Sequence, residues 1–231
     1  MSQVVFGKEV YTTLEEWVQP DRTAVLVIDM QNDFCHRDGA GAKKGRDWQS
    51  AEAIIPRLGA FLDKARAVGV RIVYCLNAQR ADALYLAPAE IGRRMKKSGG
   101  DPLLWTIEGT WGHDVVAPLA PRPGDVIVRK HRPSAFYQTD LGMVLRTQRI
   151  VSLVITGVGT RGCVESTARD AQSRDFYIVI PEDTTASQRS EWYEAAMLLA
   201  ASLYHWIGPS TEIEAIWDKL GSREQRKREV G

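Results

Sequence analysis

Short runs of apolar and β-branched residues alternate along the chain with longer amphipathic stretches, and this alternation limits the fold more than any other feature. The runs are almost continuously apolar, which is typical of strands in a parallel sheet that is covered on both faces. The predicted strands cover residues 23–28, 70–76, 125–128, 152–156, 176–180 and 204–207, and the predicted helices cover residues 49–68, 140–147, 163–173, 190–203 and 211–220. The sequence therefore predicts a doubly wound (Rossmann-like) α/β fold, in which a mainly parallel six-stranded sheet lies between two layers of helices.

The length and composition of the chain favour one domain. With 231 residues, of which 44% are hydrophobic, the chain can bury the core of a single α/β domain. We expect this domain to span residues 23–220, preceded by an N-terminal extension over residues 1–22 and followed by a frayed, charged tail over residues 221–231. The connection over residues 77–110 is long for a compact domain, so we expect it to form a lid or a subunit contact.

The charge balance gives no sign of a nucleic-acid or membrane partner. Thirty Lys and Arg residues against 29 Asp and Glu residues leave a net charge of +1. The N-terminus lacks the apolar segment of a signal peptide, and no run approaches the roughly 18 apolar residues of a membrane helix. The three cysteines, Cys35, Cys75 and Cys163, are widely spaced and form neither a disulfide framework nor a zinc pattern. These features predict a cytoplasmic protein with reduced thiols.

The stretch ITGVGTRGCVESTARD, residues 155–170, allows two functional interpretations. Gly157, Gly159 and Gly162 form the G-x-G-x-x-G pattern of a dinucleotide-binding turn, and Glu182 follows 20 residues later, where an acid would bind the ribose. This pattern would fit an NAD-dependent oxidoreductase. However, about four predicted strands precede the turn, whereas a dinucleotide-binding fold normally begins with it. In the second interpretation, Cys163 is a nucleophile at the start of a helix.

The second interpretation gives a role to two other residues. Asp29 directly follows the strand at residues 23–28, Lys130 comes two residues after the strand at 125–128, and Cys163 follows the strand at 152–156. Because the carboxyl ends of parallel strands meet at one edge of a sheet, we expect an acid, a base and a thiol to converge there. That edge is where open α/β sheets bind their ligands.

Three ordered segments carry a family resemblance. VLVIDMQNDFC, VIVRKHRPSAFYQTDL and VITGVGTRGCVESTARDA contain Asp29, Lys130 and Cys163, respectively. Together they resemble the isochorismatase-like cysteine hydrolases, and the stretch from DPLLWTIEGT to FYQTDL is most similar to the branch that contains ureidoacrylate hydrolase and N-carbamoyl amidohydrolases. The similarity extends from about Thr23 to Trp217. It implies an enzyme that forms a homodimer or homotetramer.

The three converging side chains can together hydrolyse an amide. The positive N-terminal end of a helix and the charge of Lys130 would both favour the Cys163 thiolate. Asp29 would accept the thiol proton as general base and return it to the departing nitrogen as general acid. The resemblance further implies a cis peptide bond between Val158 and Gly159, which would direct the backbone N–H groups of Gly159 and Cys163 towards the substrate oxyanion.

Residues that contact the substrate are less clearly marked. Phe34 matches a family position that packs against the substrate, Trp111 could line the pocket, and Arg161 could bind a substrate carboxylate. We expect the other tryptophans to lie in the core or in subunit contacts: Trp48, Trp105, Trp192, Trp206 and Trp217. None of the histidines stands in the Asp-x-His pattern of the metal-binding nicotinamidases, so neither a metal nor another cofactor is expected: His36, His113, His131 and His205.

These patterns predict a cysteine amidohydrolase. It would cleave a C–N bond of a small linear amide or ureido (carbamoyl) compound through a thioester, and would release ammonia or carbamate. Two alternatives remain open at this point: an NAD-dependent oxidoreductase that uses the glycine turn at residues 157–162, and a non-catalytic binding subunit of the same fold.

Overall fold

The computed structural model describes residues 2–100, 102 and 105–230. It contains a seven-stranded sheet, in which six strands have the order β5-β4-β3-β6-β7-β9. The seventh strand, β8, pairs with β6 outside this path. All pairings in the sheet are parallel. The strands are β3 (Thr23–Ile28), β4 (Arg71–Asn77), β5 (Val126–Lys130), β6 (Ser152–Val158), β7 (Tyr177–Pro181), β8 (Thr185–Ala186) and β9 (Trp206–Gly208). The predicted fold class is confirmed, and the ends of the predicted strands differ from the observed ends by at most two residues. The predicted number of strands was one too low, because β8 has only two residues and so cannot show a periodic pattern.

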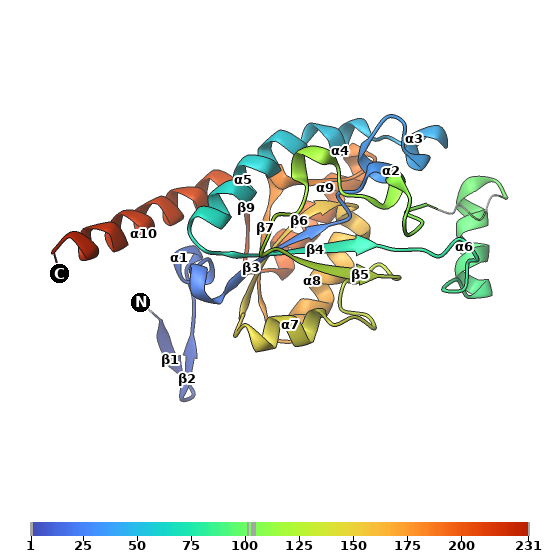
Figure 1. Cartoon of the computed structure of the whole chain (residues 1–231). Coiled ribbons are helices and arrows are strands. Elements are labelled where there is room, and N and C mark those ends of the chain that lie inside the picture. The colour runs from blue at the N-terminus through green and yellow to red at the C-terminus, as the bar shows by residue number, and fades with distance from the viewer. Residues whose placement is uncertain (1, 101, 103–104, 231) are drawn as a thin grey trace.

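The residues of β3 alternate between the two faces of the sheet. Val25 and Val27 belong to one buried cluster, which includes side chains of α5 (Ile55–Ala67) and α10 (Ser210–Val230). Leu26 and Ile28 belong to the opposite cluster, which includes side chains of α7 (Leu141–Thr147), α8 (Glu165–Gln172) and α9 (Ser190–Leu203). Figure 1 shows α5 and α7 on opposite sides of the sheet. The fold is therefore a three-layer sandwich.

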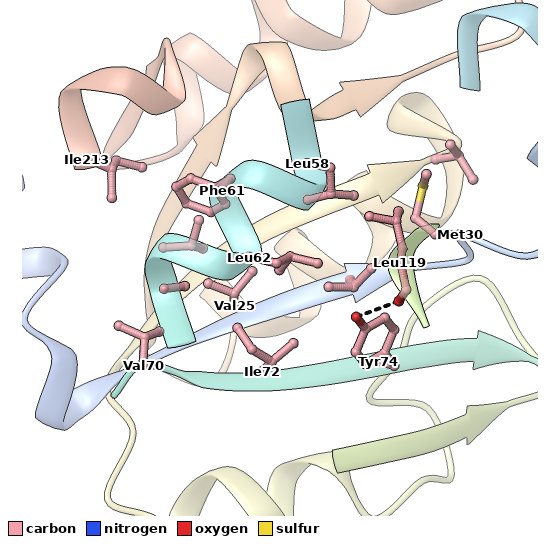
Figure 2. Close-up of a cluster of buried hydrophobic side chains, with 14 of the residues drawn as sticks. Val25, Met30, Leu58, Phe61, Leu62, Val70, Ile72, Tyr74, Leu119 and Ile213 are labelled. Carbon is pink, nitrogen blue, oxygen red and sulfur yellow. Dashed lines mark hydrogen bonds between the residues drawn. The ribbon is translucent and has the colours of Figure 1, made fainter. Parts of the chain in front are cut away.

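Figure 2 shows part of the first cluster, in which Phe61 and Leu62 of α5 lie against Val25 and Ile72 of the sheet. The Tyr74 hydroxyl, which is buried in the same cluster, donates a hydrogen bond to the Leu119 carbonyl at 2.8 Å. Each large apolar side chain that is fully buried in this way contributes roughly 1.5–3 kcal/mol to folding.

Two helices differ from the prediction. The helix predicted over residues 49–68 is divided into α4 (Gln49–Ala53) and α5, because Pro56 in the first turn of α5 has no N–H to continue the preceding helix. The helix predicted over residues 211–220 continues as α10 to Val230, so most of the segment expected to be a frayed tail is helical.

The remaining elements surround this sandwich. Residues 1–22, predicted only as an extension, include a hairpin of β1 (Gln3–Val5) and β2 (Lys8–Val10), which lies apart from the sheet in Figure 1. After it comes α1 (Leu14–Trp17), which begins with a capping box between Thr13 and Glu16. The other short helices are α2 (Asn32–Cys35), α3 (Ala40–Lys43) and α6 (Pro88–Ser98). No helix in the described part of the chain is long and apolar enough to cross a lipid bilayer.

The long connection over residues 77–110 leaves the sheet and returns to nearly the same place. The Gln79 N–H donates to the Thr106 carbonyl at 3.0 Å, the Glu108 N–H donates to the Gln79 carbonyl at 2.9 Å, and the Thr106 hydroxyl donates to Asn77 Oδ1 at 2.8 Å. Between these anchored ends the connection forms α6, which lies beyond the carboxyl ends of β4 and β5 (Figure 1). The connection is therefore positioned over the edge of the sheet where ligands bind.

Gly157, the first glycine of the G-x-G-x-x-G pattern, allows β6 and β3 to approach each other at this edge. Its φ is +106°, and a Cβ atom added there would lie 2.1 Å from the Ile28 carbonyl oxygen. Because Ile28 directly precedes Asp29, this close contact fixes where the chain leaves β3. The glycine is required by packing between two strands.

We predict that Gly157→Ala lowers the free energy of unfolding by about 2–4 kcal/mol, the combined effect of overpacking and of a strained φ. Urea unfolding followed by circular dichroism measures this loss. The control is Gly162→Ala, since an added Cβ at Gly162 has no atom within 4 Å. Equal losses in the two variants would contradict the packing role of Gly157.

Candidate active site

Asp29 occupies a strained turn at the end of β3. Its φ of 54° lies in the left-handed region, which non-glycine residues seldom adopt. The turn is held by hydrogen bonds from the Asp29 N–H to the Cys75 carbonyl at 3.0 Å and from the Gln31 N–H to the Asp29 carbonyl at 2.7 Å. The side chain is buried, and its Oδ1 atom accepts the Asn77 N–H at 2.9 Å. Such strain at a buried carboxylate is typical of functional sites.

Lys130 lies at the end of β5 and reaches across the end of β4 to Asp29. Its ammonium nitrogen is 2.9 Å from Asp29 Oδ2, and the Lys130 side chain is completely buried. It also donates to the Arg132 carbonyl at 3.4 Å. Burial alone would lower the pKa of Lys130, but attraction to Asp29 raises it above the ordinary value. Lys130 is therefore a permanent cation.

Cys163 lies in a π-helical turn, Thr160–Val164, that joins β6 to α8. The Cys163 thiol lies close enough to Asp29 and Lys130 for both charges to act on its pKa, and it lines the same cavity as Asp29. Burial and the Asp29 charge raise the pKa of Cys163 to about 12, although Lys130 acts in the opposite direction. The expectation that the surroundings favour a thiolate was therefore wrong, since the loss of solvation outweighs the cation. The Asp29 side chain beside the thiol is the candidate acceptor of its proton.

The backbone of the glycine turn differs from the expectation. The described residues contain no cis peptide bond, so the Val158–Gly159 bond is trans. Gly159 instead makes the turn with a left-handed φ of 79°, and its N–H donates to the Ala186 carbonyl of β8 at 2.9 Å. The predicted use of the Gly159 N–H in an oxyanion hole is contradicted, because the pairing of β6 with β8 already engages this donor. Of the two predicted donors, the Cys163 N–H remains.

The alternative role of the glycines in binding a dinucleotide gains no support. The space beside Gly157 is filled by the Ile28 backbone, and the Gly162 N–H donates to the Gly159 carbonyl at 2.7 Å. Glu182, the expected ribose-binding acid, lies in a 3-10 turn after β7 and does not line the cavity that contains Cys163.

A cavity of about 350 Å³ opens above Asp29 and Cys163. Of the predicted substrate contacts, Phe34 and Arg161 line it, and the Arg161 guanidinium lies 3.7 Å from the centre of the Trp192 ring. Trp111 does not line it: its side chain is 49% exposed and its ring packs against His36. The Trp111 carbonyl accepts a hydrogen bond from Asn32, which fixes this loop outside the cavity.

Sequence reasoning missed several residues of the cavity wall. Trp105 and Trp192, assigned to core or subunit contacts, line the cavity, whereas Trp217 is fully buried in the core as expected. The missed charged residues come from two loops and α6: Arg46, Asp47, Glu90, Arg93, Arg94 and Arg132. The only signal in the sequence was the unusual length of the connection over residues 77–110.

The described residues contain no group of three or more His, Cys, Asp or Glu side chains arranged to hold a metal ion. His131 lines the cavity, but its Nδ1 atom lies 2.7 Å from the Ala78 carbonyl oxygen and its ring lies against Tyr85. These contacts hold His131 in place in the wall.

Comparisons with known proteins identify similar sequences and structures. The family model for the isochorismatase domain matches residues 23–212. The ureidoacrylate amidohydrolase RutB of Agrobacterium fabrum is 35% identical over 201 residues, which cover 82% of this chain and 87% of that protein.

Solved structures of similar shape include two named hydrolases. The N-carbamoylsarcosine amidase of Thermoplasma acidophilum has a TM-score of 0.65 and 25% identity, over 82% of this chain and 96% of that chain. A cysteine hydrolase of Pseudomonas syringae pv. phaseolicola has a TM-score of 0.75 over 87% of this chain and 94% of that chain. Its 24% identity supports the fold alone.

We predict that Asp29→Asn lowers the pKa of Cys163, because the variant lacks the negative charge that raises it. Lys130→Met should raise the pKa further. The pH dependence of Cys163 alkylation by iodoacetamide, followed by peptide mass spectrometry, measures both shifts. In the wild type the rate should increase with pH far above neutrality. A wild-type thiol that is already fully ionised at pH 7 would disprove this description of the site.

Proposed function

Because the chain belongs to the isochorismatase family, we propose that it is a cysteine-dependent amidohydrolase that cleaves a small linear ureido or amide compound through a thioester. Its curated relatives are amidohydrolases, and the chain is accordingly a hydrolase that acts on the C–N bonds of linear amides. The observation that carries the finer proposal is that Asp29, which forms a buried ion pair with Lys130, and Cys163 line the same cavity.

In the proposed reaction Asp29 accepts the proton of the Cys163 thiol as the sulfur attacks the substrate carbonyl carbon. A C–S bond forms and the carbonyl π electrons move to oxygen. When the tetrahedral intermediate collapses, the C–N bond breaks and protonated Asp29 gives its proton to the departing nitrogen. Asp29 then accepts a proton from water, whose oxygen attacks the thioester carbon. As the C–S bond breaks, the proton returns to the sulfur, and Asp29 and Cys163 regain their starting forms.

Lys130 would hold the Asp29 carboxylate in place by their ion pair and offset the negative charge that develops as the thiol is deprotonated. The Cys163 N–H is the proposed donor to the oxyanion, in place of the pair of N–H groups expected from the sequence. One such donor is typically worth about 10²–10³ in rate.

The ureido compound is proposed as substrate on the basis of two relatives, which are named as ureidoacrylate amidohydrolase and N-carbamoylsarcosine amidase. The product would be ammonia or carbamate. A cytoplasmic location is part of the proposal, since three free cysteines suit a reducing compartment. Assembly into a homodimer or homotetramer stays a prediction.

We predict that Cys163→Ala reduces the release of ammonia or carbamate from a ureido substrate by at least about 10³-fold, because the variant lacks the nucleophile. A coupled ammonia assay, after acid treatment to release ammonia from carbamate, measures the loss. Cys75→Ala is the matched control, since Cys75 is a fully buried thiol outside the cavity, and it should retain activity.

Two other results would overturn the proposal in favour of the alternatives. Hydride transfer with NAD that persists in Cys163→Ala would indicate an oxidoreductase. Tight binding of ureido compounds, with equal and negligible turnover by the wild type and by Cys163→Ala, would indicate a non-catalytic subunit.

A further inference from the structure

Arg46 is a cation of the cavity wall that has no counterion among the described residues. Arg46, from the loop between α3 and α4, lines the cavity, and its guanidinium lies 4.0 Å from the centre of the Trp105 ring. No Asp or Glu side chain in the described part of the chain forms an ion pair with Arg46. Asp47, the adjacent acid, is engaged in capping α4, because its Oδ1 atom accepts the Gln49 N–H at 2.8 Å.

The neighbours of Arg46 add to its charge. Arg93 and Arg94 of α6 line the same cavity and share one carboxylate, Glu90, at distances of 2.5 and 2.8 Å. Their hydrogen bonds lower the pKa of Glu90 to about 2, so this carboxylate is ionised. Burial, together with the charges of Arg93 and Arg94, lowers the pKa of Arg46. Arg46 therefore lies near two further guanidinium groups at the end of the cavity formed by α6.

This arrangement is costly without an anion. A desolvated guanidinium that faces other cations is unfavourable unless an opposite charge pairs with it. The cation is nevertheless held in position, because Arg46 lies over Trp105, and Phe34 packs edge-on against the same ring with centroids 5.7 Å apart. A planar guanidinium fixed in this way presents its N–H groups to a carboxylate in the geometry of a bidentate pair.

We propose that Arg46, together with Arg93, forms the subsite that binds the carboxylate of the substrate, and that the enzyme therefore selects ureido acids over neutral ureas and amides. The inference rests on the proposed function, since it assigns the charged end of the molecule whose ureido group reacts at Cys163. Both ends lie in one cavity, because Arg46, Arg93 and Cys163 all line it. Arg93 is close enough to Cys163 for the two charges to interact.

The subsite gives the long connection over residues 77–110 a function. This connection supplies Arg93 and Trp105, whereas Arg46 comes from the loop between α3 and α4. A carboxylate between them would bridge the two segments and neutralise the surplus charge. A neutral substrate would leave these cations unpaired, and it would therefore bind more weakly.

The test compares two substrates of equal length, 3-ureidopropanoate and N-propylurea, in which a methyl group replaces the carboxylate. Arg46→Gln should raise KM for the acid by about 10- to 100-fold, the effect of losing hydrogen bonds from a charged group, and leave its kcat nearly unchanged. It should leave kcat/KM for N-propylurea unaffected. Arg46→Lys, which keeps the charge but not the planar fork, should fall between Arg46→Gln and the wild type.

A matched control and a stability measurement distinguish an effect on substrate specificity from an effect on folding. Arg37→Gln removes the same charge from an exposed residue outside the cavity and should change neither substrate's kinetics. Because Arg46 carries an unbalanced charge, Arg46→Gln should unfold at the same temperature as the wild type or at a higher one. If Arg46→Gln lost kcat/KM equally for 3-ureidopropanoate and N-propylurea, or unfolded at a clearly lower temperature, the subsite would be overturned.

Calorimetric binding of 3-ureidopropanoate to Cys163→Ala and to Cys163→Ala/Arg46→Gln distinguishes this inference from the proposed function. Binding that is lost only in the double variant supports the subsite, even when the wild type does not hydrolyse the compound. Hydrolysis by the wild type with equal binding by the two variants would refute the subsite while leaving the amidohydrolase proposal intact.

Discussion

The buried ion pair between Asp29 and Lys130 is the interaction on which the site depends. Each group alone would be costly to bury, and each is stabilised because the other lies 2.9 Å away. The pair comes from β3 and β5, which are separated by β4, so it also fixes the geometry of the sheet edge. The two members of the pair have opposite effects on the pKa of Cys163: the Asp29 carboxylate raises it, and the Lys130 ammonium lowers it. The Cys163 thiol therefore keeps its proton until it reacts.

Sheet topology explains why these groups meet. The chain passes from β3 to β4 and β5 on one side, and then returns to β6 on the other side of β3. Asp29 and Cys163 therefore follow the two strands that flank the switch point, where α/β folds bind their ligands. Gly157 allows these strands to come close, and β8 holds the N–H of Gly159. The glycines that resemble a dinucleotide-binding turn thus position Cys163.

The sequence predicted the sheet and the meeting of Asp29, Lys130 and Cys163, because continuous apolar strands and their polar ends are local patterns with one topological consequence. It could not predict the ionisation of Cys163 or the direction of the Gly159 N–H, since both depend on burial and on β8, a strand of two residues. Trp111 was wrongly placed in the cavity wall, and Arg46, Trp105 and Trp192 were not predicted to line it. The reason is similar, because loop side chains carry no periodic signal and only the folded chain shows which of them face the cavity.

A thiol, a buried carboxylate and several guanidinium groups line one cavity, and we propose that the sulfur of Cys163 becomes covalently bonded to the substrate carbon during turnover. Acid quenching during turnover of a ureido substrate, followed by peptide mapping, examines this bond directly. The account predicts an added acyl or carbamoyl mass on the Cys163 peptide. An adduct on a different residue, or undiminished turnover by protein whose Cys163 has been completely alkylated, would contradict it.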